Sequence, residues 1–450
     1  MAGTWKAQNK RRPGAYVNVK GTGDATSESS VGRLLMISDA SLDWGAKGII
    51  SLTSGSNFKA KLGTDLDNEQ LLALKEALKG AETVLFLNPN GGEAAKGTAE
   101  NSPFNFTANY PGLKGNDISV SIEPEIVVNG AMPTKATVTT LFGASIVDQR
   151  IITATDIEKF SNDFVTATPV DNPVLPTSAI SIKLSDGITN KVEVTDLLND
   201  ALENENYSVV TTGGIDTKSN IHALLVEAVK RLREDEGIKV RAVVPGDDST
   251  TTYNYEGVSV VGNGFVESDG RIIDTTNAAA FFAGVSASAD AGTSLTYYTV
   301  SDAMEASPKL NNEKTINALN AGQIVFTTRP GQRVVVEQDI NSLTKFTADR
   351  PKEFSKNRVI RTIDDICTNS VDVFEQTFLG KVGNDANGRD LFKANRIAYL
   401  SNLQQNGIIQ SFDNADVVVE KGNDSDSILV NIAVIPVDSM EKLYMTLVVR

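Results

Sequence analysis

The sequence predicts an α+β multidomain chain: an α/β N-terminal domain with an inserted all-β sandwich, then a C-terminal α/β domain, with a strand-like segment at each end. The 450 residues exceed what one hydrophobic core usually organises. Helical periodicity alternates with buried-strand patterns on both sides of residues 98–192. Within that region, short alternating runs prevail and helical periodicity is weak.

Residues 1–30 are expected to form an arm and a linker. "TWKAQNKRRPG" is polar, and "TGDATSESS" has the composition of a flexible spacer. Between them, "AYVNVKG" alternates in the manner of a short strand. The residues of this predicted strand are Tyr16, Val17, Asn18 and Val19.

Residues 31–97 and 193–330 are expected to form one discontinuous α/β domain. In the first part, "VGRLLMISD" predicts a buried strand and "TDLDNEQLLALKEALKG" a helix that Gly80 ends. In the second part, "NIHALLVEAVKRLREDEG" predicts an amphipathic helix and "KVRAVVPG" a strand. "NAAAFFAGVSASA" predicts a small-residue helix or a buried turn.

Residues 98–192 are expected to form the inserted β-sandwich. The runs "ISVSIEPEIVVNG", "KATVTTLFG", "SIVDQRIIT" and "AISIKLSDG" are short, alternate in polarity and are separated by Gly, Pro, Asn and Asp.

Residues 331–435 are expected to form a C-terminal domain with two helices. The first, "TIDDICTNSVDVFEQTFLG", begins with a capping-box-like pair, Thr362 and Asp365. The second, "NGRDLFKANRIAYLSNLQQNG", ends at Gly407 and is expected to bury Leu391, Ile397, Leu400 and Leu403. Strands are expected at about 408–412, 416–420, 428–435 and 443–449.

The last of these segments belongs to a C-terminal arm, residues 436–450. Its alternating residues are Leu443, Tyr444, Met445, Thr446, Leu447, Val448 and Val449. From the residues alone, the segment is either the last strand of the chain's own sheet or a strand that pairs with another chain.

Composition excludes several classes of function. There are 42 basic and 57 acidic residues, a net charge of −15, which argues against nucleic acid as the main partner. A single cysteine and a single histidine exclude a zinc site of the Cys/His type. No apolar run reaches the length of about 18 residues that a transmembrane helix needs, so no direct membrane insertion is expected. The first residues lack the apolar core of a signal peptide, which predicts synthesis in the cytoplasm.

The motif search predicts neither an enzyme nor a cofactor site. No phosphate-binding GxxxxGK[ST] motif occurs. His222 and Cys367 lie on predicted helices, without partners that would make either a catalytic group. "NDANGRD", at residues 384–390, lacks the glutamate that completes a calcium loop and is interpreted as a connection between helices. A chain of this size without catalytic residues is expected to bind or to assemble.

Three stretches together resemble one family. They are "GTWKAQNKRRPGAYVNVK", "FTANYPGLKGNDISVSI" and "TTRPGQRVVVEQDINSLTKFTADRPKEFSKNRVIRTIDDI" with the helices and strands that follow. The sequence resembles the contractile tail sheath proteins of myophages and R-type bacteriocins, in the form found in Gram-positive hosts and their defective prophages. The alternatives are another phage tail component, such as a tube or baseplate protein, and a secreted hydrolase with a carbohydrate-binding sandwich.

The resemblance implies a homo-oligomer of stacked hexameric rings around a tail tube, which contracts to drive the tube through the target envelope. The other implied partners are the baseplate and the tail terminator, and the implied location is the virion or tailocin tail. Both arms would donate strands to neighbouring C-terminal domains, with residues 21–30 and 436–442 as hinges. The helix at 362–379 or its neighbours would contact the tube, with Asp364, Asp365, Asp372 and Glu375 as candidates; the alternative is that these four carboxylates form a solvated face.

Overall fold

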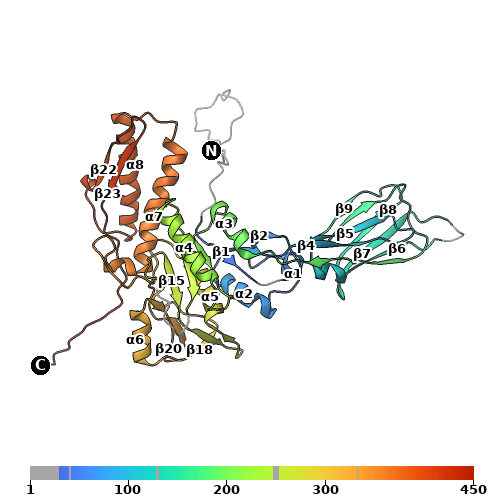
Figure 1. Ribbon diagram of the computed structural model, residues 1–450, viewed down its shortest axis with the longest axis horizontal. Helices are drawn as coiled ribbons and strands as arrows, with labels where there is room; N and C mark the ends of the chain where they lie inside the picture. Colours follow the sequence, from blue (N-terminus) through green and yellow to red (C-terminus); the bar gives the residue numbers. More distant parts are fainter. Residues whose placement is uncertain (1–29, 40–41, 128–130, 247–252, 332, 450) are drawn as a thin grey trace, which may run out of the picture.

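The computed structural model describes residues 30–39, 42–127, 131–246, 253–331 and 333–449. The predicted strand at Tyr16–Val19 therefore lies outside the described residues. The chain is a mixed α+β protein with a β-sandwich. Figure 1 shows the sandwich at one end, an α/β sheet in the middle, and α7 and α8 on the far side of that sheet.

The central sheet has seven strands in the order β19-β15-β14-β13-β1-β3-β2. Neighbouring strands are parallel, except that β2 runs antiparallel to β3. The bounds are β1 (Arg33–Ile37), β2 (Gly48–Leu52), β3 (Thr83–Asn88), β13 (Val209–Thr211), β14 (Arg241–Pro245), β15 (Val258–Val261) and β19 (Gln323–Ile324).

Helices cover both faces of this sheet. Leu34 and Met36 of β1 share a core with α2 and α5, whereas Leu35 and Ile37 share the opposite core with α3 and α4. Burial on both faces explains why the strands are almost wholly apolar. The helices before the C-terminal region are α1 (Phe58–Leu62), α2 (Leu72–Leu78), α3 (Val194–Asn204), α4 (Ile221–Glu234), α5 (Thr275–Ala287) and α6 (Asn312–Asn320), with the 3₁₀ turn η1 (Glu69–Leu71) before α2.

The small-residue stretch predicted as a helix or a buried turn is α5, a buried helix. It packs so closely on α2 that a Cβ atom at Gly284 would lie 2.1 Å from the carbonyl oxygen of Ala77. The helix expected from residue 64 starts later, because Asn68 accepts a hydrogen bond from the amide of Gln70 and caps the 3₁₀ turn instead.

Two sheets form the sandwich, in the orders β12-β4-β5-β10-β9 and β11-β6-β7-β8. Their inner faces share a core that includes Phe104, Phe106 and Val138. The bounds are β4 (Gly92–Gly97), β5 (Phe104–Pro111), β6 (Ile118–Pro124), β7 (Lys135–Phe142), β8 (Ser145–Thr153), β9 (Phe160–Ser161), β10 (Val165–Pro169), β11 (Ile180–Lys183) and β12 (Ile188–Thr189), with the 3₁₀ turn η2 (Leu113–Asp117).

Two small sheets are separate from the central sheet, in the orders β17-β16-β18 and β20-β21. Their bounds are β16 (Gly264–Glu267), β17 (Ile272–Ile273), β18 (Ala303–Ser307), β20 (Phe326–Arg329) and β21 (Arg333–Val336).

The C-terminal region consists of two long helices and one hairpin. Strands β22 and β23 pair antiparallel and β22 packs on α8. The bounds are η3 (Lys352–Ser355), α7 (Asn357–Val373), a π-helical turn η4 (Phe374–Phe378), α8 (Ala386–Gln405), η5 (Asn414–Asp416), β22 (Val417–Lys421) and β23 (Ile428–Ile432).

Several predictions for this region are wrong in detail. Helix α7 begins at Asn357, so Thr362 lies inside it and does not cap it; its hydroxyl donates to the carbonyl oxygens of Ala291 and Arg358. In α8, Leu391 is exposed, and the neighbouring Phe392 is buried in its place. The strand expected at about 408–412 is only a single bridge between Ile409 and Pro436.

Candidate assembly interface

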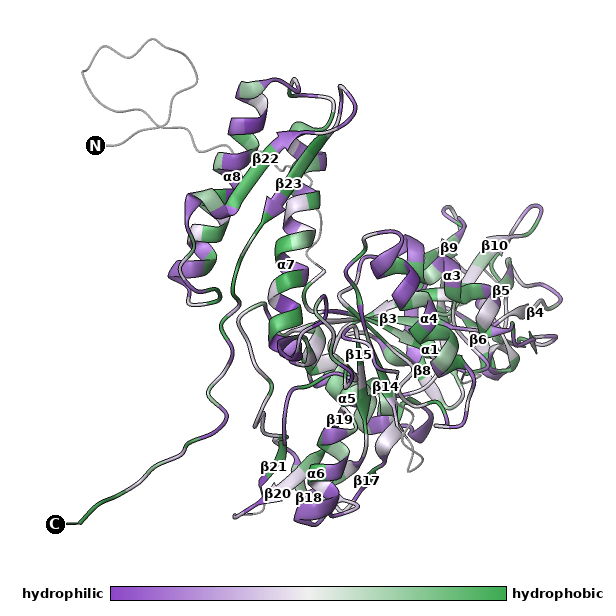
Figure 2. Cartoon of the chain, turned by 60° about the vertical axis from the view of Figure 1, so that its left-hand side comes forward, coloured by the Kyte–Doolittle hydropathy of each residue, from purple (hydrophilic) through white to green (hydrophobic). Residues whose placement is uncertain are grey.

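The C-terminal segment 443–449 belongs to no strand of the described chain. The six apolar side chains between Leu443 and Val449 are 72–89% exposed. Figure 2 shows this segment as an extended, mostly apolar stretch that leaves the body of the protein. Because apolar side chains gain free energy when they leave water, the segment is suited to burial against a partner.

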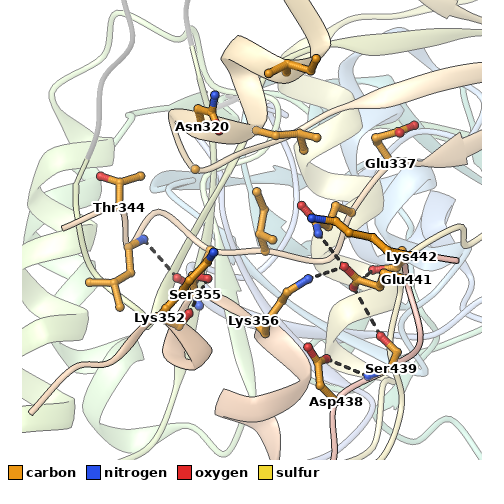
Figure 3. A pocket seen from close by; sticks show the side chains of 18 of the residues that line it. Asn320, Glu337, Thr344, Lys352, Ser355, Lys356, Asp438, Ser439, Glu441 and Lys442 are labelled. Atoms are coloured by element: carbon orange, nitrogen blue, oxygen red, sulfur yellow. Dashed lines mark hydrogen bonds and ion pairs between the residues drawn. The ribbon is translucent and has the colours of Figure 1, made fainter. Parts of the chain in front are cut away.

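Glu441, two residues before this segment, attaches the chain to the body of the protein. Its carboxylate accepts hydrogen bonds from Thr296 Oγ1 at 2.9 Å and Gln338 Nε2 at 2.5 Å, and it forms an ion pair with Lys356 (Figure 3). The hydroxyl oxygen of nearby Ser439 lies 3.2 Å from that of Ser294. Residues 436–442, expected to be a hinge, are thus attached to the body at Pro436, Val437, Ser439 and Glu441, and the chain leaves the body only after Glu441.

The environment of Glu441 favours its ionised form. Burial alone would raise the pKa of this carboxyl group, but the hydrogen bonds from Lys356 and Gln338 outweigh burial and hold the pKa below its ordinary value. The anchor therefore carries a full negative charge near neutral pH.

A groove of about 890 Å³ lies beside this anchor. Its wall combines apolar side chains of α6, such as Ile316 and Leu319, with Phe346 and with the anchored residues Glu441 and Lys442 (Figure 3). The groove thus adjoins the point where the C-terminal segment leaves the body.

Among the described residues, the sheet β22–β23 consists of two strands, and each strand has one edge on which no further strand pairs. A two-stranded sheet is marginal alone and gains hydrogen bonds when a further extended segment pairs with its edge. The exposed side chain of Leu429 on β23 offers apolar surface beside such an edge.

The four acidic residues proposed for tube contact do not lie in equivalent places. Asp364 is buried, and its carboxylate accepts hydrogen bonds from Nη1 of Arg233 at 2.9 Å and from Nη2 at 2.8 Å. Its charge therefore does not face solvent. Asp365 is half-buried and accepts a hydrogen bond from the hydroxyl of Tyr399. Asp372 and Glu375 are exposed, near the end of α7 and in the π-helical turn.

The remaining motif candidates have structural roles. His222 is buried, with Nδ1 2.6 Å from the hydroxyl of Thr212 and Nε2 2.8 Å from the carbonyl oxygen of Asp216, and burial lowers its pKa. Cys367 is half-buried, which raises the pKa of its thiol. Asp385 caps α8 through a hydrogen bond from the Gly388 amide.

Neither a cluster of metal-binding side chains nor a membrane-spanning helix occurs in the part of the chain that the structure describes. In that part, no three His, Cys, Asp or Glu side chains come together in a way that could hold a metal ion. None of its helices is both long and apolar enough to cross a membrane.

Sequence reasoning missed the anchor residues Thr296, Gln338, Lys356 and Glu441. They come from four separate places in the sequence, and only the fold brings them together. The one local signal is that polar Glu441 and Lys442 directly precede an apolar run.

Models of three phage tail sheath domains match the chain. They are the β-sandwich domain over residues 90–196, the central domain over 189–342 and the C-terminal domain over 349–450.

Two Bacillus subtilis proteins are similar over nearly the whole chain. The phage-like element PBSX protein XkdK is 31% identical over 97% of both chains, and the uncharacterized protein YqbK is 31% identical over 98% of both. A tail sheath protein of a Clostridium phage is 26% identical over 44% of this chain and 53% of its own length.

Solved structures show the same relationship. The sheath tail protein of Desulfitobacterium hafniense is 32% identical over 96% of this chain and 99% of its own, with a TM-score of 0.75. The sheath tail protein Lin1278 of Listeria innocua is 28% identical over 93% of this chain and 95% of its own, with a TM-score of 0.78. The anti-feeding prophage sheath in its contracted state is 12% identical over 96% of this chain and 98% of its own, with a TM-score of 0.54, which shows a shared fold.

The relatives that are named as tail sheath proteins are structural, and they indicate no catalytic function. Matching domains from residue 90 to residue 450, together with relatives above 30% identity over nearly the full length, show that this chain belongs to the phage tail sheath protein family.

Proposed function

We propose that this chain is the subunit of a contractile tail sheath. Subunits assemble in the host cytoplasm into stacked hexameric rings around a tail tube, between a baseplate and a tail terminator. Contraction of the sheath drives the tube through the target envelope. The proposal is supported by family membership and by the fold shared with a sheath that was solved in a contracted state.

One observation carries the assembly mechanism: the apolar, exposed segment 443–449. In the proposal, it adds a strand to the β22–β23 sheet of a neighbouring subunit. Backbone hydrogen bonds then supply affinity, and alternate side chains supply specificity. Tyr16, Val17, Asn18 and Val19 are proposed to donate a second strand in the same way.

The proposed domains follow the same plan. Residues 31–97 with 193–330 form the α/β domain, 98–192 the inserted sandwich, and 331–435 the C-terminal domain that donated strands complete. Residues 1–30 and 436–450 are the arms. This division separates a folded body from two segments that act on other subunits.

Tube contact is assigned to the exposed acidic residues Asp372 and Glu375. Asp364 does not fit this role, because its buried carboxylate forms an ion pair with Arg233. Asp365 fits it less well than Asp372 does, since its carboxylate already accepts the Tyr399 hydroxyl.

The test is a pair of substitutions at one position, with the full chain co-expressed with its tube protein. Met445→Pro removes a backbone N–H and opposes an extended ladder, whereas Met445→Val favours a strand. Electron microscopy of Met445→Val should show sheathed tubes, and Met445→Pro should leave tubes bare. Sheaths of equal length from both variants, and from a chain truncated after Ile435, would show that the C-terminal strand is not needed.

A further inference from the structure

The groove beside the Glu441 anchor leaves much of the apolar side of helix α6 uncovered. None of the residues of α6, all of which the structure describes, is buried. Ile316 is 47% exposed, and both Ile316 and the half-buried Leu319 line the groove. Because an amphipathic helix normally buries its apolar stripe, α6 has apolar surface left for a further contact.

Two aromatic residues extend this apolar surface along the groove. Phe346 is 46% exposed and Tyr297 is 49% exposed, and both line the groove. Tyr297 has a φ angle of 61°, which bulky residues rarely adopt, and strained backbone of this kind is concentrated at functional sites. With its volume of about 890 Å³, the groove falls in the range of about 300–1,000 Å³ that is typical of binding sites.

The C-terminal segment 443–449 starts at the wall of this groove. Lys442 lines the groove, and Leu443 follows it directly. The segment has six apolar side chains that are 72–89% exposed, and its full length is at most about 25 Å. Because Glu441 holds the chain two residues earlier, the segment stays close to the groove. Such a short tether gives a high effective concentration, which favours a contact within the chain.

We propose that segment 443–449 of the unassembled chain closes over this groove as a strap, with its apolar side chains against Ile316, Leu319 and Phe346. The extended segment in Figure 2 is the open form of this strap. Closure removes apolar surface of both the segment and the groove from water, which is its driving force. The contact uses side chains, so the backbone amides of the segment gain no ladder hydrogen bonds from it.

The consequence of the strap for assembly rests on the proposed function. A closed strap withholds its strand from a neighbouring subunit, so closure competes with strand donation. The contact itself needs neither a tube nor a second subunit and is therefore tested on the single full chain. A sheath that assembles without a strap, and a strap in a chain that forms no sheath, are distinguishable results.

The test measures disulfide formation within the dilute full chain under oxidised glutathione, after Cys367→Ser has removed the native thiol. Asn320→Cys places a thiol at the exposed end of α6, and Thr446→Cys places one in the segment. Both substitutions replace polar residues, so the apolar side chains of the groove and the segment are kept. Thr446→Cys paired with Glu100→Cys, at an exposed position of the sandwich, is the control for random encounter.

A second control separates the apolar contact from the tether. It adds Ile316→Ser and Phe346→Ser to the first cysteine pair, which keeps the length of the tether and removes much of the apolar wall. Both side chains are about half exposed, so the unfolding midpoint should stay close to that of the parent chain. Should the midpoint fall, Phe346→Ser alone serves for the same comparison.

The strap predicts that the pair at residues 320 and 446 forms a disulfide within one chain about tenfold faster than the control pair. Ile316→Ser with Phe346→Ser should slow this reaction about tenfold, because the buried apolar contact is lost. Equal rates with and without these serine substitutions overturn the proposal, since the tether alone then accounts for the reaction. Disulfides that join two chains instead of closing within one overturn it as well.

Discussion

Lys356, the N-cap residue of α7, forms an ion pair with Glu441, the last anchored residue before the exposed C-terminal segment. Helix α7 carries the candidate tube contact near its other end. The ion pair therefore connects the start of this helix to the base of the C-terminal arm, which is proposed to bind a neighbouring subunit. The direction in which the arm leaves the body is therefore coupled to the position of α7.

Glu441→Gln should loosen the root of the arm. The carboxylate is mostly buried and accepts hydrogen bonds from four side chains, so loss of its charge should cost on the order of 1–3 kcal/mol of local stability. Hydrogen exchange of residues 436–442 should speed up accordingly. Glu100→Gln, at an exposed glutamate of the sandwich, should leave these rates unchanged.

The same anchor should depend on pH. Because the folded-state pKa of Glu441 lies below its ordinary value, its contribution is present above about pH 4.5 and is lost as the pH falls through the folded-state value. The protection factors of residues 436–442, which are corrected for the slower intrinsic exchange in acid, should thus fall on acidification in the native chain. If Glu441→Gln shows the same fall in protection, another group is responsible.

The Arg233–Asp364 pair should hold α7 against α4. Burial alone would lower the pKa of Arg233, but the Asp364 carboxylate outweighs burial and raises it. Asp364→Asn leaves a buried cation uncompensated and should cost about 3–5 kcal/mol in urea unfolding. Glu305→Gln, which breaks an exposed pair with Lys309, should cost less than about 1 kcal/mol.

The double variant Arg233→Met with Asp364→Leu separates charge from packing. It should recover much of the stability lost in Asp364→Asn, since it removes both buried charges together. A double variant no more stable than Asp364→Asn would contradict this account of the pair.

Glu76 should make the chain less stable as the pH rises. It is fully buried, and burial raises its pKa to about 7 despite an ion pair with Lys79 at 2.8 Å. The folded state then binds more protons than the unfolded state between about pH 4.5 and 7, so stability falls across this window. A rise of the pKa from 4.5 to about 7 corresponds to roughly 3 kcal/mol at most.

Urea unfolding at about pH 5 and pH 8 tests this relation. Glu76→Gln should reduce the difference between the two pH values, with Glu100→Gln as the matched control. An undiminished difference in Glu76→Gln would assign the pH dependence to other groups.

Asp372 and Glu375 should matter for tube binding and not for folding. Both side chains are exposed, so Asp372→Lys with Glu375→Lys should leave unfolding nearly unchanged. The same variant should reduce the fraction of tubes that carry a sheath, because charge at an interface affects association. The control is the charge reversal Glu100→Lys in the sandwich. If the fraction of sheathed tubes is the same in the control and in the double variant, Asp372 and Glu375 are not part of the tube contact.

The sequence was sufficient for features that depend on local periodicity. Apolar residues that recur about every 3.6 positions predict helix α4, and apolar residues that recur every 2 positions predict the strands of the sandwich. The buried strands of the central sheet are predicted by short, almost wholly apolar runs. Helix α7 shows where this reasoning ends: the polar stretch from Asn357 is helical because Asn357 and Arg361 bond to Asp339 in the tertiary structure.

The site was predicted only where one segment carries it. The run 443–449 was visible as an apolar, β-prone stretch, and its pairing with a neighbour stays a prediction. The anchor around Glu441 and the Arg233–Asp364 pair join residues 85–145 and 131 positions apart, and no local pattern marks such partners.

Hydrogen exchange of residues 443–449 in assembled sheath, compared with the unassembled chain, tests the central claim most directly. A donated strand predicts that the amides of this segment exchange fast in the single chain and become strongly protected on assembly, with protection of the free edge of β22 or β23 at the same time. Sheaths in which residues 443–449 still exchange as fast as in the single chain would contradict strand donation by the C-terminal arm.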